Sequence, residues 1–429
     1  MEHKESESPV QSRAVEKLFF LPRKILDRWR KVVTIEVLII TIGVLLAIAI
    51  RLTTLNSMTL DYFASLKPWY NTIRSQGFSV FATDFSTYNP PYLYLLYLIA
   101  RFFPDTPVVA AVKLPSLIAD FVMAYFVYRI VQIKYPKGLI PISAGMAVLF
   151  APTVVLNSGF WGQADSLFTA GLVACLFFLL VEKQGLAMLA FGIALAFKLQ
   201  AIFIAPLLFA LLLRKAIPWR FFLIIPAILA LALIPAWIAG RPIPDLLNIY
   251  LFQTSQFELL TMNAPSLYAW LPSTKQVFNL FYIPGVIFGG IAAYCLFLIA
   301  LKAPEKLKRE AIVELTLLSM VLIPFSLPKM HERYFYPADV ISIAFAFYYP
   351  QLYYIPILIG GVSFFAYEPY LFNVEQIPMP ILTAALLITI CILTYNTMKR
   401  LYRPELPPRS NPPIEPDSPA AADQTAEEA

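Results

Sequence analysis

The sequence predicts an all-α polytopic membrane protein with about twelve transmembrane helices, and three observations carry this prediction. Of the 429 residues, 59% are hydrophobic and only 14% are charged, whereas soluble domains carry about 25% charged residues. The chain also contains a series of apolar runs, many long enough to cross a hydrocarbon core of about 30 Å. Finally, its lysines and arginines sort the connecting segments onto two membrane faces.

Twelve apolar segments are expected to cross the membrane. They are 34–52, 108–130, 140–156, 166–182, 185–197, 200–213, 217–239, 276–301, 311–327, 336–350, 353–368 and 379–398. The run 90–103, "PPYLYLLYLIARFF", is apolar but only 14 residues long. We therefore assign it to a juxtamembrane or re-entrant helix of the first outer loop, 53–107, within one transmembrane domain, 34–398.

The distribution of Lys and Arg predicts the orientation. With the N-terminus in the cytoplasm, 23 of the 33 Lys and Arg residues fall on inner segments, as the positive-inside rule expects. Making 90–103 a crossing would export the basic stretches "RKAIPWR" and "KAPEKLKRE", so that topology is rejected. The polar islands of the chain then gather on the outer face, where cytosolic ATP and nucleotide sugars are not readily available.

The chain ends are expected to be accessory. Residues 1–33 form a basic cytoplasmic tail, within which 11–31 mix basic and apolar residues and predict an interfacial helix. No cleavable signal peptide is apparent. Residues 399–429 are rich in Pro, Asp and Glu, which predicts a disordered cytoplasmic tail. The three cysteines lie in apolar segments without disulfide or metal spacing and are expected to be packed thiols: Cys175, Cys295 and Cys391.

Two carboxylates of the first outer loop are candidates for chemistry. Asp61 lies in "TLDYFASLKPW" and Asp84 in "TDFSTYNPPYLYLL". A carboxylate near the membrane surface can act as general base on a hydroxyl nucleophile within hydrogen-bond reach. The alternative is that Asp61 caps a helix or is solvated, and that the diproline of the second stretch simply begins a helix.

Residues 185–213 contain one interior charge, Lys198. Basic residues at both ends belong inside, so this run must cross twice with its turn near Lys198. Each half spans about 20 Å of helix, which is shorter than the hydrocarbon core. The turn is therefore expected below the outer surface, where an ionisable group is a candidate functional residue and suits a phosphate at the membrane interface. The alternative is a lysine that snorkels to the surface.

The stretch "LPKMHERYFY" places His331, Glu332 and Arg333 at the outer end of a span. Arg matches phosphate oxygens bidentately, His adds a hydrogen bond or a proton, and Glu332 can orient them. The alternative is a surface loop in which Glu332 and Arg333 pair with each other or with lipid headgroups.

Two further outer stretches, "NSGFWGQADSL" and "LLTMNAPSLYAWLP", supply aromatic rings and amides. Trp161 and Trp270 are read either as interface-belt residues or as sugar-stacking surfaces. Asp120 and Asp165 are unusual membrane carboxylates, expected to be buried and hydrogen-bonded inside the bundle. The chain has neither a P-loop nor a dinucleotide-binding glycine pattern.

In this order, these stretches resemble motifs of the GT-C superfamily of polytopic glycosyltransferases. The nearest likeness is to the dolichyl-phosphate-glucose glucosyltransferases and to the related mannosyltransferases of glycosylphosphatidylinositol assembly. "LDYFASLKPW" is similar to "GDYEAxRxW", "DFSTYNPPYLYLLY" to "DYPPLxAY", "GFWGQADS" to "GHFQYNS", "FKLQAIFIAP" to "YKQMALYYAP" and "KMHERYF" to "QVHEKSI". The chain departs from the pattern at Leu60, which replaces a glycine, at Arg333, which replaces a lysine, and at Gln163-Ala164-Asp165, where the family has a tyrosine or asparagine.

The resemblance implies an inverting transfer of a hexose, mannose or glucose, from a polyprenyl-phosphate donor to a hydroxyl acceptor on the extracytoplasmic face. It implies Asp61 as catalytic base and binding of the donor phosphate by Lys198, His331 and Arg333. The candidates for substrate binding are Trp69, Asp84, Tyr88, Trp161, Gln163, Asp165, Asn263 and Glu332. It suggests no cofactor and no obligatory metal, although Asp61, Asp84 and Asp165 are carboxylates of the kind that can hold a divalent cation.

Two other classes of function stay open. A transporter or lipid flippase would use Asp120, Lys198 and His331 as intramembrane relay charges, although the sequence contains no convincing internal repeat. A lipid-A-type or cell-wall ligase would share the topology but use a different donor. The expected partners are the lipid-linked donor, a lipid-linked or protein glycan acceptor and membrane lipids, with no nucleic acid. The expected location is the plasma membrane, or the endoplasmic reticulum in a eukaryote.

Overall fold

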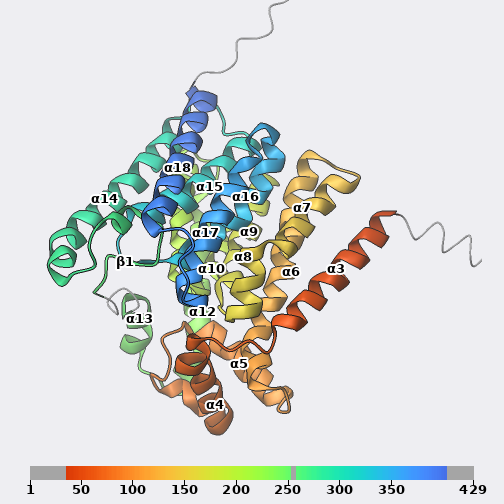
Figure 1. The fold of residues 1–429 in the computed structure, drawn as a ribbon, viewed down its shortest axis with the longest axis vertical. Coiled ribbons are helices and arrows are strands. Elements are labelled where there is room, and N and C mark those ends of the chain that lie inside the picture. Colours follow the sequence, from red (N-terminus) through yellow and green to blue (C-terminus); the bar gives the residue numbers. More distant parts are fainter. Residues whose placement is uncertain (1–34, 253–257, 403–429) are drawn as a thin grey trace, which may run out of the picture.

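A computed structural model describes residues 35–252 and 258–402 of the chain, and most of this part is helical (Figure 1). Its two strands, β1 (Thr261–Met262) and β2 (Met330–His331), form one short parallel pair. The predicted all-α polytopic class is therefore confirmed. The N-terminal tail lies outside the described residues, as does the C-terminal tail beyond Tyr402, while residues 399–402, expected at the start of that tail, form the last turn of α18 (Met379–Tyr402).

Within the described residues, six helical segments are long and apolar enough to cross a membrane. They are α3 (Ile35–Thr54), α6 (Val108–Lys134), η5 (Trp219–Leu223) with α12 (Ile224–Ile238), α14 (Lys275–Lys302), η8 (Pro350–Leu352) with α17 (Tyr354–Phe372), and α18 (Met379–Tyr402). A seventh candidate is α7 (Leu139–Phe150), which meets α8 (Pro152–Val154) and η3 (Val155–Trp161) at a bend of 44°.

Shorter helices complete the bundle: α9 (Asp165–Leu180), α10 (Gln184–Phe197), η4 (Leu199–Ile204), α11 (Ala205–Leu213), α15 (Arg309–Ser326) and α16 (Tyr336–Tyr348). Each of the twelve predicted segments thus coincides with a helix or a pair of helices. The predicted break near Lys198 is confirmed, because α10 ends at Phe197 and Lys198 is extended (φ −155°, ψ 133°). The short helices α10 and α11 are consequently two half-length elements, joined by a half-buried turn at Lys198 and by η4.

The centre of the bundle is formed by α6, α9, α15 and α16, with α7 and α10 packed against them. By contrast, α3 and α12 are the least buried of the candidate spans and expose apolar side chains over most of their length, as lipid-facing helices do. Cys175 is buried in α9 as expected. Cys295 and Cys391 are exposed on α14 and α18, so the prediction that they are packed is wrong. Both cysteines lie on the sides of α14 and α18 that do not pack against the rest of the bundle.

A second layer covers one end of the bundle, at the bottom of Figure 1. It consists of η1 (Tyr62–Leu66), α4 (Lys67–Gln76), η2 (Gly77–Ala82) and α5 (Pro90–Phe102), with its own aromatic core. Helix α5, which has 13 residues, is about 20 Å long and too short to cross a hydrocarbon core. Helix α13 (Ile243–Phe252) follows α12 and contacts it.

At the end of the bundle where the sequence places its basic residues, cations hold helix ends together. Lys134 donates to the carbonyl of Tyr348 at 2.6 Å, Arg214 to that of Leu301 at 2.7 Å, and Arg309 to that of Leu180 at 2.9 Å. The last carbonyls of a helix lack partners within the helix, so each of these contacts caps one helix with a cation from another.

Candidate active site

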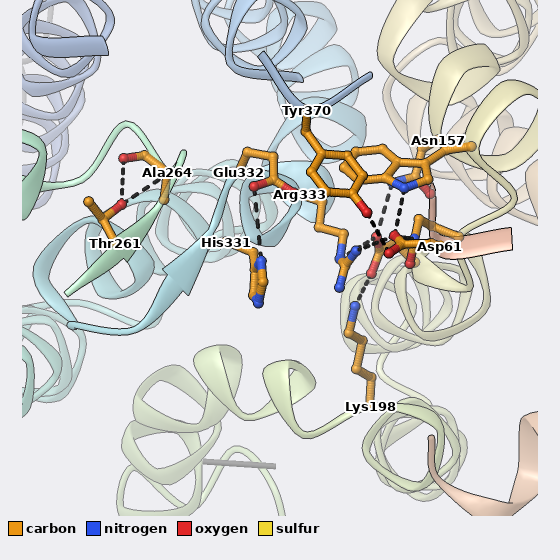
Figure 2. A network of polar contacts seen from close by, with 12 residues as sticks. Asp61, Asn157, Lys198, Thr261, Ala264, His331, Glu332, Arg333 and Tyr370 are labelled. Atoms are coloured by element: carbon orange, nitrogen blue, oxygen red, sulfur yellow. Dashed lines mark hydrogen bonds and ion pairs between the residues drawn. The ribbon is translucent and has the colours of Figure 1, made fainter. Parts of the chain in front are cut away.

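Asp61 lies just before η1, at the entry to the covering layer, and three side chains donate hydrogen bonds to its carboxylate (Figure 2). Trp161 donates its indole N–H to Oδ2 at 2.8 Å and Gln163 its amide to the same oxygen at 2.5 Å. Tyr370, near the end of α17, donates its hydroxyl to Oδ1 at 2.6 Å. The side chain keeps 29% exposure, so the carboxylate is fixed in orientation yet accessible.

The segment that carries Trp161 and Gln163 ends η3 with a turn that needs glycine. Gly162 has φ +81°, a left-handed conformation that glycine adopts without strain. This turn lets the side chains on both sides of it reach Asp61. Trp161 also stacks on Tyr370 at 5.0 Å, which brings two of the three donors into contact with each other.

Asp165, the first residue of α9, is fully buried and forms an ion pair with Lys198. Asn157 donates to its other oxygen at 3.0 Å. A carboxylate at a helix start also faces the positive end of the helix dipole. The ammonium of Lys198 lies over the rings of Phe168 and Tyr334, at 5.5 and 5.2 Å, and its side chain is 14% exposed. A lysine held by Asp165 and two aromatic rings does not snorkel.

Arg333, in η7 (Glu332–Phe335), joins the two carboxylates. Its NH1 lies 3.6 Å from Oδ2 of Asp61 and its Nε lies 3.8 Å from Oδ2 of Asp165. The guanidinium also lies over the ring of Trp161 at 5.5 Å. Among the described residues, the buried Nε has no hydrogen-bond acceptor. Buried N–H groups nearly always have an acceptor, so a buried N–H without one points to an acceptor supplied by a ligand.

His331 and Glu332 lie beside Arg333 on the same short segment. His331 Nδ1 is 4.0 Å from the Glu332 carboxylate. Burial and the positive charges of Arg333 and Lys198 lower the pKa of His331 to about 2, so the imidazole is neutral. Burial raises the pKa of Glu332 to about 7, although Arg333 opposes this shift. Asn263, with φ +51°, forms an antiparallel backbone bridge to His331 and so belongs to the support of this segment.

Two aromatic candidates lie next to the cluster formed by Asp61, Asp165, Lys198 and Arg333. The hydroxyl of Tyr88 donates to Gln163 at 2.7 Å, and the ring of Trp69 packs on Tyr88 at 5.0 Å between centroids. Tyr88 therefore connects to Asp61 through Gln163, and Trp69 connects to Asp61 only through Tyr88 and Gln163.

Asp84 does not join the cluster. It is 70% exposed and pairs with Arg241 at 2.7 Å. Arg241 follows the end of α12, so this contact joins the segment after α12 to the loop that contains Asp84. Trp270 donates to the carbonyl of Pro380 at 3.2 Å and packs outside the cluster. Across the described ranges, no group of three or more His, Cys, Asp or Glu side chains is placed to hold a metal ion.

Asp120 is buried and hydrogen-bonded, as the sequence predicts. Arg51 of α3 donates to it at 2.9 Å, and Ser158 of η3 donates at 2.6 Å. Four residues that contact Asp61, Asp165 or Lys198 were not among the candidates: Asn157, Phe168, Tyr334 and Tyr370. The available signal for Tyr370 was a polar, aromatic stretch, Glu368-Pro369-Tyr370, at the outer end of a predicted crossing.

No family model matches the chain, and no curated protein matches it. Among solved structures it is similar to the crystal structure of ArnT from Cupriavidus metallidurans bound to undecaprenyl phosphate. The TM-score is 0.52 at 10% sequence identity, and the match covers 84% of this chain and 77% of that chain. The chain has a GT-C-like fold. At this identity the likeness shows the fold alone, so the narrower resemblance to glucosyl- or mannosyltransferases remains a prediction.

Proposed function

We propose that this protein is a membrane glycosyltransferase that moves a hexose, mannose or glucose, from a polyprenyl-phosphate donor to a hydroxyl acceptor on the extracytoplasmic side, with inversion. One observation carries the proposal: a partly exposed carboxylate, Asp61, lies in the same ion-pair cluster as the cations Lys198 and Arg333. The GT-C-like fold, and the undecaprenyl phosphate bound to ArnT, support it.

Asp61 is the proposed general base. The acceptor hydroxyl passes its proton to the carboxylate as its oxygen attacks the anomeric carbon. The bond from that carbon to the phosphate oxygen breaks, and its electron pair leaves with the polyprenyl phosphate. The hydrogen bonds from Trp161, Gln163 and Tyr370 support this role because they fix the direction in which the carboxylate points.

Lys198 and Arg333 are the proposed ligands of the donor phosphate. Negative charge grows on this group as the glycosidic bond breaks, and cations held in place stabilise it. Arg333 Nε lacks a hydrogen-bond acceptor among the described residues, so its N–H can donate to a phosphate oxygen. His331, being neutral, contributes a hydrogen bond and no charge.

An apolar groove of about 640 Å³ between α5, α6, α9 and α10 supports a lipid-linked donor. It begins at Leu167, within one turn of Asp165, and continues along α9 to Phe178 and along α10 from Ile193 to Leu186. A polyprenyl chain in this groove would keep its phosphate near Lys198. The transporter alternative has less support, because Asp120, one of its relay groups, is paired with Arg51.

The test is a transfer assay with the purified full chain in nanodiscs. Synthetic undecaprenyl phosphate carrying labelled mannose or glucose is the donor, and a membrane lipid extract supplies acceptors. The expected result is release of undecaprenyl phosphate and a labelled product with the anomeric configuration opposite to that of the donor. Movement of intact donor across sealed proteoliposomes, without cleavage of either sugar, would instead favour a flippase.

A further inference from the structure

Lys113 of α6 is a buried cation that takes no part in the cluster around Asp61. Its side chain is 1% exposed, and its ammonium lies among five oxygens. These are the carbonyls of Thr54 (3.1 Å), Leu55 (3.2 Å), Ser57 (2.7 Å) and Phe160 (3.2 Å), together with the Ser57 hydroxyl (2.9 Å). An ammonium has three N–H donors, so it is shared among the oxygens as a bound cation would be.

The five oxygens belong to the two segments that build the proposed base. Thr54, Leu55 and Ser57 end α3 and begin the loop that leads to Asp61, while Phe160 directly precedes Trp161. The last carbonyls of α3 carry the negative end of its helix dipole, which favours a cation at this place. Lys113 therefore joins the Asp61 segment to the segment that donates hydrogen bonds to Asp61.

The stem of Lys113 supports the same arrangement. A Cβ atom at Gly162, between the two donors Trp161 and Gln163, would lie 3.2 Å from Cγ of Lys113. The aliphatic stem thus packs directly against this left-handed turn. The Ser57 hydroxyl, which contacts the ammonium, also donates to the Phe160 carbonyl at 2.7 Å.

We propose that Lys113 is a positioning residue whose ammonium, held in a cage of five oxygens, fixes the Asp61 segment against the Trp161–Gln163 segment. The proposal rests on the proposed function in so far as Asp61 is the base. The structural part of the proposal is that the Lys113 ammonium holds the two segments together. This part can be tested without a sugar-transfer assay.

The first test is kinetic and uses Lys113→Ala in the full chain. A displacement of Asp61 by about 1 Å is expected to lower kcat about 100-fold. The KM for undecaprenyl-phosphate hexose should stay within about twofold, because Lys198 and Arg333 do not contact Lys113. Methylammonium fits the emptied cage and should restore part of kcat, whereas choline is too large. Lys113→Arg should keep more activity than Lys113→Ala, and Lys67→Ala, at an exposed lysine of the same layer, should be unchanged.

The second test follows Trp161 by ¹⁹F NMR of 5-fluorotryptophan-labelled protein, with its resonance assigned by Trp161→Phe. In Lys113→Ala the resonance should shift or broaden, and methylammonium should return it toward the wild-type position. An unmoved resonance, or a kcat loss that methylammonium does not reverse, overturns the proposal. If the wild type transfers no sugar but the resonance responds as described, the proposed function fails and the role of Lys113 stands.

Discussion

The guanidinium of Arg333 lies 3.6 Å from the carboxylate of Asp61, so the proposed base and a proposed phosphate ligand are in direct contact. In the proposed displacement the attacking hydroxyl and the leaving phosphate lie on opposite sides of the anomeric carbon, so the sugar has to bind where Asp61 can reach the hydroxyl and Arg333 can reach the phosphate. Arg333 also reaches Asp165, the partner of Lys198, so one side chain connects the base to the second cation.

Replacing Asp61 with Asn should remove the base while keeping the shape of the side chain. We expect kcat for sugar transfer to fall about 10²- to 10⁴-fold, the usual range for loss of a general base, with a smaller loss of thermal stability because the Asn amide NH₂ group cannot accept the hydrogen bonds that Asp61 accepts. The matched control is Asp84→Asn, an exposed carboxylate of the same loop that pairs with Arg241. Equal losses in the two variants would mean that the loop, not Asp61 itself, matters.

Arg333→Lys keeps the charge but loses the planar fork that contacts both carboxylates. The KM for the polyprenyl-phosphate donor should rise about tenfold, because Lys binds a phosphate as a point charge and not bidentately. Arg101→Lys, at an exposed arginine of α5, is the control. A donor KM unchanged in Arg333→Lys would argue against a direct contact between Arg333 and the phosphate.

Lys198→Met should destabilise the protein as well as inactivate it. Asp165 is fully buried, and removing one partner of a buried pair typically costs about 3 kcal/mol. The double variant Lys198→Met/Asp165→Asn removes the stranded charge, so its thermal midpoint in detergent should recover while transfer stays lost. Recovery of activity in the double variant would remove Lys198 from the phosphate site.

Glu332 should make stability depend on pH. Because burial raises its pKa from 4.5 to about 7, the folded state holds this proton more tightly than the unfolded state. Its contribution to stability is fully present below pH about 4.5 and is lost as pH rises through about 7. Relative to Glu332→Gln, the wild-type thermal midpoint should therefore fall across this window. Parallel profiles for the two proteins would contradict the shift.

Much of the framework follows from local patterns in the sequence. The apolar runs locate the helices, and the basic residues at both ends of 185–213 force a turn at its single interior charge, Lys198. The outer stretches containing Asp61, Trp161 and Arg333 belong together once the topology is known, because all three end on one face.

The remaining contacts depend on packing between distant elements. Asp61 and Asp84 occupy the same loop, yet one meets Trp161 and the other meets Arg241, and nothing local in the sequence distinguishes them. Tyr370 donates to Asp61 although 309 positions of sequence separate them. In the sequence, Lys113 is a single lysine within the predicted span 108–130. Its proposed role depends on the contact between the loop after α3 and helix α6, which the sequence does not reveal.

The most direct measurement is an electron cryomicroscopy structure of the full chain in nanodiscs with undecaprenyl phosphate. The account predicts phosphate density within hydrogen-bond distance of Lys198 and Arg333, on the side of the cluster that Asp61 faces, with the prenyl chain along α9 and α10. A headgroup bound elsewhere, in particular beside Lys134 and Arg309 at the opposite end of the bundle, would contradict it.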